Sequence, residues 1–170
     1  MPDRQLMRRA WRSILDVVPM AAYSCDTEGR ITYFNQRAGA VWGRSVRLLD
    51  RRTRFCGSQR LYSADGAPMR HDECWMARAL FEDRSYNGRG VQIGRPDGSR
   101  IQGLVHANPV HNSEGRVIAA VNLIAEVPGP DMLAIVAVAL GVLAGLRWPV
   151  TAFSWGRHRS QLQRYRHAIQ

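Results

Sequence analysis

Two cysteines and a histidine are the residues in this chain whose types and order could hold a metal ion. Cys56, His71 and Cys74 carry the sulfur and nitrogen atoms that zinc prefers, and two residues separate His71 from Cys74. A strong zinc pattern needs two such closely spaced pairs, and only one is present. The alternative is structural, with His71 and Asp72 beginning a helix and Cys74 packing as a small apolar side chain. Cys56, His71 and Cys74 are thus metal-ligand candidates, but we do not expect a metal.

Haem is a second cofactor that histidine, cysteine and methionine side chains could bind. Covalent haem attachment needs the pattern CxxCH, which the chain lacks. Axial ligation by His71, His106 or Met76 stays open, although an isolated histidine is more often structural.

The carboxylates give no sign of an acid-base pair. Five of them stand close to turn glycines, where a structural role is sufficient. They are Asp26, Glu28, Asp65, Asp97 and Glu114. We therefore expect that the protein is not an enzyme.

Composition indicates one folded domain with additional elements. The chain has 170 residues, of which 45% are hydrophobic and 22% charged, so a packed core is expected. The net charge of +10 comes from scattered arginines without a basic helix bearing aromatic residues, so we expect no nucleic-acid partner. Three widely spaced cysteines do not form a disulfide framework. Residues 1–12 lack the apolar run of a secretory signal, which favours a cytoplasmic location.

The N-terminal residues predict an amphipathic helix. Within residues 4–18, apolar side chains recur at three- and four-residue steps and form one stripe. Pro19 cannot continue a helix, so residues 1–18 make the first segment. The stripe consists of Met7, Trp11, Ile14, Leu15 and Val18.

Residues 19–127 predict a domain of strands and short helices. Two runs rich in β-forming residues, 20–26 and 31–34, flank a turn and predict a hairpin. Asn35 is expected to cap a short helix that ends at Gly43.

The second half of this domain begins with a weaker pattern. Residues 44–69 predict helical turns and loops, and Asp72 is expected to cap a helix over 73–83. Three strand-like runs joined by two tight turns then predict an antiparallel meander. These runs are residues 88–95, 100–110 and 116–127.

The last strand is apolar on both faces, and such a strand is covered on both faces. The short helices cover one face. The other cover is the N-terminal helix, from the same chain or from a second subunit. We therefore expect a homodimer that forms through residues 1–18.

This order of elements, over residues 16–127, resembles a PAS sensor domain. A more specific likeness is the run R-F-C-G-S-x-R-L-Y-x-x-D-G-x-P-x-x-H-D-E-C-x-M-A, which stands here as residues 54–77. The resemblance implies an α+β fold over residues 19–127. In that fold a five-stranded antiparallel sheet carries short helices on one face, and the N-terminal helix lies outside.

The resemblance also implies a function. PAS domains of this kind act as sensory or dimerisation modules in bacterial signal transduction, including two-component systems. We expect the module to relay a signal to a partner kinase, a cyclic-di-nucleotide enzyme or a transcription regulator. Two alternatives stay open, namely a cofactor-free protein-protein interaction module and a haem- or metal-binding sensor.

The ligand of such a domain would lie between the inner sheet face and the helices. Asn122 stands in the middle of the last strand among apolar residues, so its amide must find a partner. That partner is either a ligand or the backbone of a short helix. The expected pocket residues are Trp42, Phe55, Cys74, Met76 and Asn122.

Flavin is the cofactor that this resemblance raises next. Some PAS domains form a cysteinyl-flavin adduct through the run Asn-Cys-Arg-Phe-Leu-Gln. Residues 54–59 resemble that run in composition but not in order, and Cys56 does not hold the matching position. This argues against flavin and leaves the cofactor unassigned.

The C-terminal residues are expected to contact a membrane. Residues 128–131 are a Pro/Gly linker, which breaks helical continuity. Residues 132–155 are largely apolar, but their uninterrupted part, 132–146, spans only about 22 Å as a helix, short of a hydrocarbon core of about 30 Å. A basic tail, 156–170, follows. We expect peripheral attachment rather than a span, with a buried helix in an oligomer as the alternative.

Overall fold

The amphipathic pattern near the N-terminus forms a helix, α1 (Arg4–Val17), as predicted. The computed structural model of the protein describes residues 4–128, with side chains from residue 9 onward. The predictions for the Pro/Gly linker beyond residue 128, the apolar segment 132–155 and the basic tail lie outside the described residues. Within 4–128, no helix is long and apolar enough to cross a membrane.

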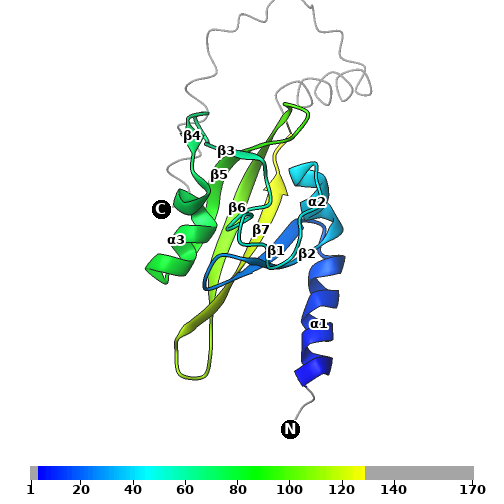
Figure 1. Ribbon diagram of the computed structural model, residues 1–170, viewed down its shortest axis with the longest axis vertical. Coiled ribbons are helices and arrows are strands. Elements are labelled where there is room, and N and C mark those ends of the chain that lie inside the picture. The colour runs from blue at the N-terminus through cyan, green and yellow to red at the C-terminus, as the bar shows by residue number, and fades with distance from the viewer. Residues whose placement is uncertain (1–3, 129–170) are drawn as a thin grey trace, which may run out of the picture. The chain divides into compact units, whose positions relative to one another are not determined.

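The fold is α+β, and its single sheet is antiparallel throughout (Figure 1). The strand order is β2-β1-β7-β6-β5-β3-β4, so the first hairpin joins the sheet beside the last strand. The strands are β1 (Ala21–Asp26), β2 (Ile31–Phe34), β3 (Arg60–Ser63), β4 (Pro68–Met69), β5 (Tyr86–Gly94), β6 (Arg100–His111) and β7 (Val117–Glu126).

The predicted number of five strands is wrong, because the sheet has seven. The two additional strands, β3 and β4, lie within residues 44–69, for which we expected turns and loops. β3 extends the sheet beyond β5, with Leu61 opposite Ile93, and both side chains are buried. Runs of four and two residues are too short to show an alternating pattern, and pairing with β5 is what makes them strands.

Three short helical elements lie beside the sheet: α2 (Gln36–Trp42), the 3-10 turn η1 (His71–Glu73) and α3 (Trp75–Glu82). The predicted ends of α2 are confirmed, since the Asn35 side chain accepts a hydrogen bond from the Ala38 backbone and Gly43 is left-handed with φ 66°. The predicted cap of the next helix is wrong. The residue before α3 is Cys74, which makes no side-chain cap, while Asp72 pairs with Arg70 at 2.5 Å.

Asn35 also connects three elements. Its Oδ1 accepts hydrogen bonds from the backbone of Ala22 and Ala38, and its Nδ2 donates to the carbonyls of Leu15 and Met20. All four bonds are 2.9–3.0 Å long. This buried amide thus joins the end of α1, β1 and the start of α2.

The core lies between the inner face of the sheet and the helices, and α3 packs against β5, β6 and β7. In Figure 1 the segment between α2 and β3 crosses in front of the central strands, between α2 and α3. On the other side, α1 packs by Trp11 against Tyr33, with ring centroids 5.3 Å apart. The outer face of β7 is still half-exposed at Val121 and Leu123.

Candidate ligand sites

A small cavity lies inside the core, between the inner sheet face and α3. Its volume is about 20 Å³, which is enough for one water molecule. Three of the expected pocket residues, Cys74, Met76 and Asn122, line it. Trp42 and Phe55 are buried in the same core but do not line this cavity.

Asn122 is paired inside this cavity, and its partners are not those expected. Its Nδ2 donates to the Tyr23 hydroxyl at 3.0 Å, and its Oδ1 accepts from the His106 backbone N–H at 3.2 Å. The Tyr23 hydroxyl in turn donates to the Phe55 carbonyl at 2.9 Å. Our expectation of a short-helix backbone partner is therefore wrong. The amide bridges β7 to β1 and β6.

Tyr23 is a residue of this site that the sequence prediction missed. Burial, together with neighbouring thiols, raises the pKa of its hydroxyl well above the ordinary tyrosine value. The hydroxyl therefore stays protonated and keeps its hydrogen bond to the Phe55 carbonyl. The available sequence signal was its position on the inward face of β1, between Ala21 and Cys25, which are also buried.

Trp42 is fully buried and lies edge-on to Tyr23, with ring centroids 5.1 Å apart. Among the described residues, its indole N–H is the one buried side-chain polar group without a hydrogen-bond partner. A buried donor of this kind is costly unless it is satisfied. The Cys56 sulfur lies near enough for this N–H to act against the rise in the pKa of the thiol.

Cys56, Ser58 and His71 form a polar chain from the core to the surface. Cys56 Sγ is 3.2 Å from Ser58 Oγ, which is 3.3 Å from His71 Nε2. His71 Nε2 also lies 3.1 Å from the Ser58 carbonyl, so this nitrogen is within hydrogen-bond distance of two Ser58 atoms.

Of the metal-ligand candidates, Cys56 lines the internal cavity with Cys74 and the outer pocket with His71. Within residues 4–128, no three histidine, cysteine or acidic side chains are grouped so as to hold a metal ion. All three cysteines are free and buried. Burial raises the pKa of Cys74 to about 12. Burial also raises the pKa of Cys56, although hydrogen bonds from Ser58 make this increase smaller. These side chains are therefore neutral thiols at neutral pH.

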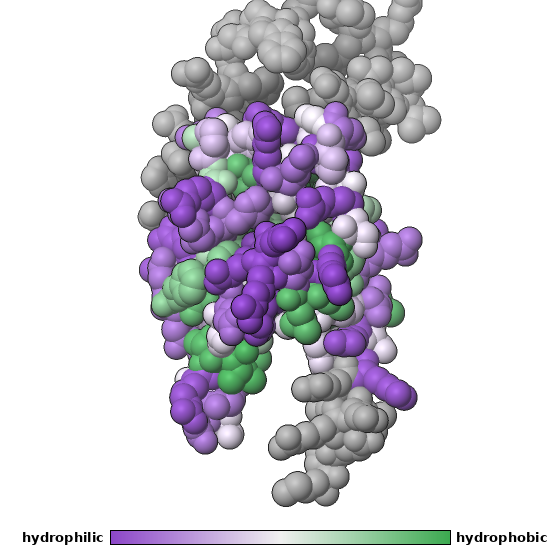
Figure 2. Space-filling model, in the orientation of Figure 1, coloured by the Kyte–Doolittle hydropathy of each residue, from purple (hydrophilic) through white to green (hydrophobic). Residues whose placement is uncertain are grey.

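A second, larger pocket opens on the outside. It has a volume of about 460 Å³ and is lined by Arg44, by residues 52–56, 58 and 59, and by Arg70, His71 and Asp72. Cys56 lines both this pocket and the internal cavity. Figure 2 shows strongly hydrophilic residues gathered over the middle of this face, where the α2–β3 segment crosses in Figure 1.

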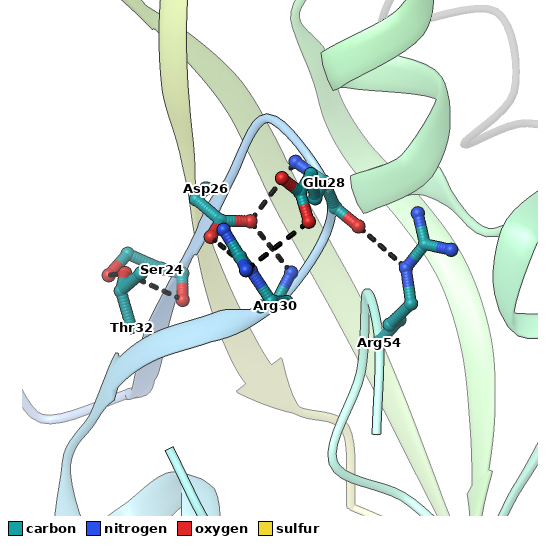
Figure 3. A network of polar contacts seen from close by, with 6 residues as sticks. All are labelled: Ser24, Asp26, Glu28, Arg30, Thr32 and Arg54. Atoms are coloured by element: carbon teal, nitrogen blue, oxygen red, sulfur yellow. Dashed lines mark hydrogen bonds and ion pairs between the residues drawn. The ribbon is translucent and has the colours of Figure 1, made fainter. Parts of the chain in front are cut away.

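A network of hydrogen bonds and ion pairs positions Arg54, which lines the outer pocket (Figure 3). Asp26 accepts hydrogen bonds from the Arg30 side chain at 2.7 Å and from the Glu28 backbone at 3.0 Å, which closes the β1–β2 turn. Arg54 Nε donates to the Glu28 carbonyl at 2.6 Å, so the turn and the α2–β3 segment are joined. The structural roles predicted for Asp26 and Glu28 are confirmed.

Phe55 is fixed by the same turn. Its backbone N–H donates to the Gly29 carbonyl at 2.7 Å, and its own φ is 65°, in the left-handed region. A Cβ on Gly29 would lie 2.2 Å from the Phe55 ring, so only glycine fits there. Strained residues of this kind persist where the surroundings hold them, often at functional sites.

Comparison with known proteins defines the fold. Neither a scan of protein-family models nor a search of curated proteins found a match. Solved structures do match. A light-oxygen-voltage (LOV) protein of Rhodobacter sphaeroides has a TM-score of 0.51 at 19% identity, covering 84% of this chain and 80% of that chain. The PAS domain of BvgS from Bordetella pertussis has a TM-score of 0.52 at 12% identity, covering 80% of this chain and 98% of that chain.

A further match is a structure titled as a flavin-analogue study of the LOV-domain mechanism. Its TM-score is 0.50 at 14% identity, covering 82% of this chain and 97% of that chain. The chain therefore has the PAS fold, as predicted. Because LOV domains are among the neighbours, the order of residues around Cys56 is not sufficient to dismiss flavin.

Proposed function

We propose that the protein is a sensory and dimerisation module of bacterial signal transduction, without catalytic activity of its own. The observation that carries this proposal is the PAS fold together with a small, mainly apolar cavity inside it. Tyr23 and Asn122 line that cavity, and Trp42 is buried in the same core. A signalling partner would be a kinase, a cyclic-di-nucleotide enzyme or a transcription regulator, and a cytoplasmic location stays a prediction.

Haem has little support as the internal ligand. His106 has its neighbours Val105 and Ala107 buried on the inner face, so its own side chain is on the outer face of β6. His71 contacts Ser58 through its Nε2 and does not line the cavity. Of the three candidate ligands, Met76 alone reaches the cavity.

Flavin is the second candidate, because LOV domains share this fold. Pockets for ligands of that size measure about 300–1,000 Å³, whereas the cavity here is about 20 Å³. A flavin ring would have to displace Met76 or Trp42, both of which are fully buried. The residues present therefore fit a water-sized occupant better than a flavin.

The absorbance spectrum and native mass of the purified full chain test these ligands. A colourless protein without bound mass fits a water-sized cavity, whereas a flavin or haem spectrum would contradict it. Light scattering on the same sample tests dimerisation. A monomer would speak against the dimerisation part of the proposed function.

The dimer would form through α1 and the outer face of β7. Ile14 and Val17 on α1 are 61% and 80% exposed, while Trp11 on the same helix packs on its own Tyr33. Leu104 and Val110 of β6 are also exposed. Exposed apolar side chains of this kind are typical of a surface that a second subunit covers.

A further inference from the structure

We propose that the outer pocket binds a small soluble molecule bearing phosphate or carboxylate groups. This inference goes beyond the sensory role, because it assigns a second site, outside the core, and the chemistry of its ligand. The volume of about 460 Å³ lies within the range of small-molecule pockets. The internal cavity, by contrast, admits about one water.

The charge of the pocket is strongly one-sided. Four arginines line it against a single carboxylate, that of Asp72. Asp72 is already engaged, because it pairs with Arg70 at 2.5 Å and this pairing lowers the pKa of its carboxyl. The four arginines are Arg44, Arg52, Arg54 and Arg70.

The other three arginines have no acidic partner in the part of the chain that the structure describes. Cations gathered around one concavity repel one another, and a bound anion offsets that repulsion. Guanidinium groups present paired N–H donors that match the oxygens of phosphates and carboxylates. The pocket therefore favours an oxyanion.

Arg54 is held in position for this role. Its Nε donates to the Glu28 carbonyl at 2.6 Å, and its guanidinium carbon lies 4.9 Å from the centroid of the Phe55 ring. These contacts occupy the Nε–H and one face of the Arg54 guanidinium group. The two terminal NH₂ groups of this side chain are left for a ligand. In Figure 3 these groups point away from the β1–β2 turn.

The floor of the pocket adds fixed polar groups. Ser58 is buried, and its hydroxyl lies between Cys56 Sγ and His71 Nε2. Phe55 keeps its left-handed backbone at the same floor through its bond to Gly29. The arginines thus stand beside a base that hydrogen bonds hold in place.

The side chains that line the pocket favour a small molecule over a nucleic acid as the ligand. The one aromatic side chain in the lining, Phe55, is buried and packs edge-on to Phe81 with centroids 5.5 Å apart. It is therefore not available to stack on bases, as single-stranded nucleic acids require.

Calorimetric titration of the full chain with inorganic pyrophosphate and with citrate tests the proposal. The two probes carry phosphate and carboxylate oxygens respectively, and ionic strength is held constant with NaCl. We expect saturable one-site binding of at least one probe. Arg52→Gln and Arg44→Gln should each weaken it about tenfold.

Arg51→Gln is the matched control, because Arg51 is the exposed neighbour of Arg52, does not line the pocket and loses the same charge. Its affinity should equal that of the wild type. The proposal is overturned if neither probe binds saturably, or if Arg51→Gln weakens binding as much as Arg52→Gln. Circular dichroism of each variant establishes that the fold is unchanged.

Discussion

The Asn122 amide donates to the Tyr23 hydroxyl at 3.0 Å, across 99 positions of sequence, and this bond joins the first strand to the last inside the core. The Tyr23 hydroxyl in turn donates a hydrogen bond to the Phe55 carbonyl at 2.9 Å. The pair therefore links the inner sheet face to the segment that carries the outer pocket.

Tyr23→Phe should destabilise the fold, because it leaves both the Asn122 amide and the Phe55 carbonyl without a buried partner. The expected loss is about 1–3 kcal/mol in the free energy of unfolding, measured by urea denaturation. Tyr62→Phe is the control, since Tyr62 is partly exposed and its ring is covered by Arg100 at 3.6 Å from the centroid. If the two variants have equal free energies of unfolding, the hydrogen bond between Tyr23 and Asn122 does not stabilise the core.

Gly57→Ala should also destabilise the fold, for a steric reason. A Cβ at residue 57 would lie 2.3 Å from Cε3 of Trp42, and the buried ring has no room to move aside. Overpacking of this kind costs about 1–3 kcal/mol.

Gly39→Ala is the matched substitution for this test. Residue 39 lies within α2, and a Cβ there would meet its nearest neighbour, Phe34 Cε2, at an ordinary 3.7 Å. Alanine in a helix is favoured over glycine by about 0.5–1 kcal/mol, so thermal melts should show opposite shifts for the two variants. A stable Gly57→Ala protein would show that the contact with Trp42 is not tight.

Stability should fall as pH rises above the ordinary thiol range. Burial raises the pKa of Cys74 to about 12, so the folded state keeps a proton that the unfolded chain releases from about pH 8.5 upward. The folded state thus binds more protons between these values, and stability decreases with pH across that window. Tyr23, Cys25 and Cys56 have raised pKa values and act in the same direction.

Cys74→Ala should make the decline of unfolding free energy with pH less steep, as measured by urea denaturation from pH 8 into the alkaline range. Ala77→Gly serves as a comparison, because it also weakens buried packing in α3 but removes no titrating group. An identical pH slope in both variants would contradict a role for the Cys74 thiol.

The sequence predicted those parts of the fold that depend on single residues and their neighbours. Asn35 and Gly43 bound α2 as expected, and Gly29 and Gly98 both have positive φ at their turns. Local chemistry decides such positions, since an amide caps a helix and glycine alone enters the left-handed region without strain.

Contacts between distant residues were not predictable in the same way. Nothing local to Asn122 indicates that Tyr23 will face it, because strand register determines the pair, with Tyr23 opposite Asn122 across β1 and β7. The outer pocket is a similar case. Its arginines looked scattered in the sequence, and folding brings Arg44 and Arg52 close to Arg70.

The proposed dimer gives the last prediction. Ile14→Glu with Val17→Glu places two charges on the exposed apolar side of α1, and burying them against a second subunit would cost far more than leaving them in water. Light scattering should therefore change from dimer to monomer, with an unchanged circular dichroism spectrum because neither side chain is buried. Leu48→Glu is the control, since Leu48 is 43% exposed but belongs to the α2–β3 segment. A dimer that persists in the double variant would place the interface elsewhere, and a monomeric Leu48→Glu would point to the α2–β3 segment instead.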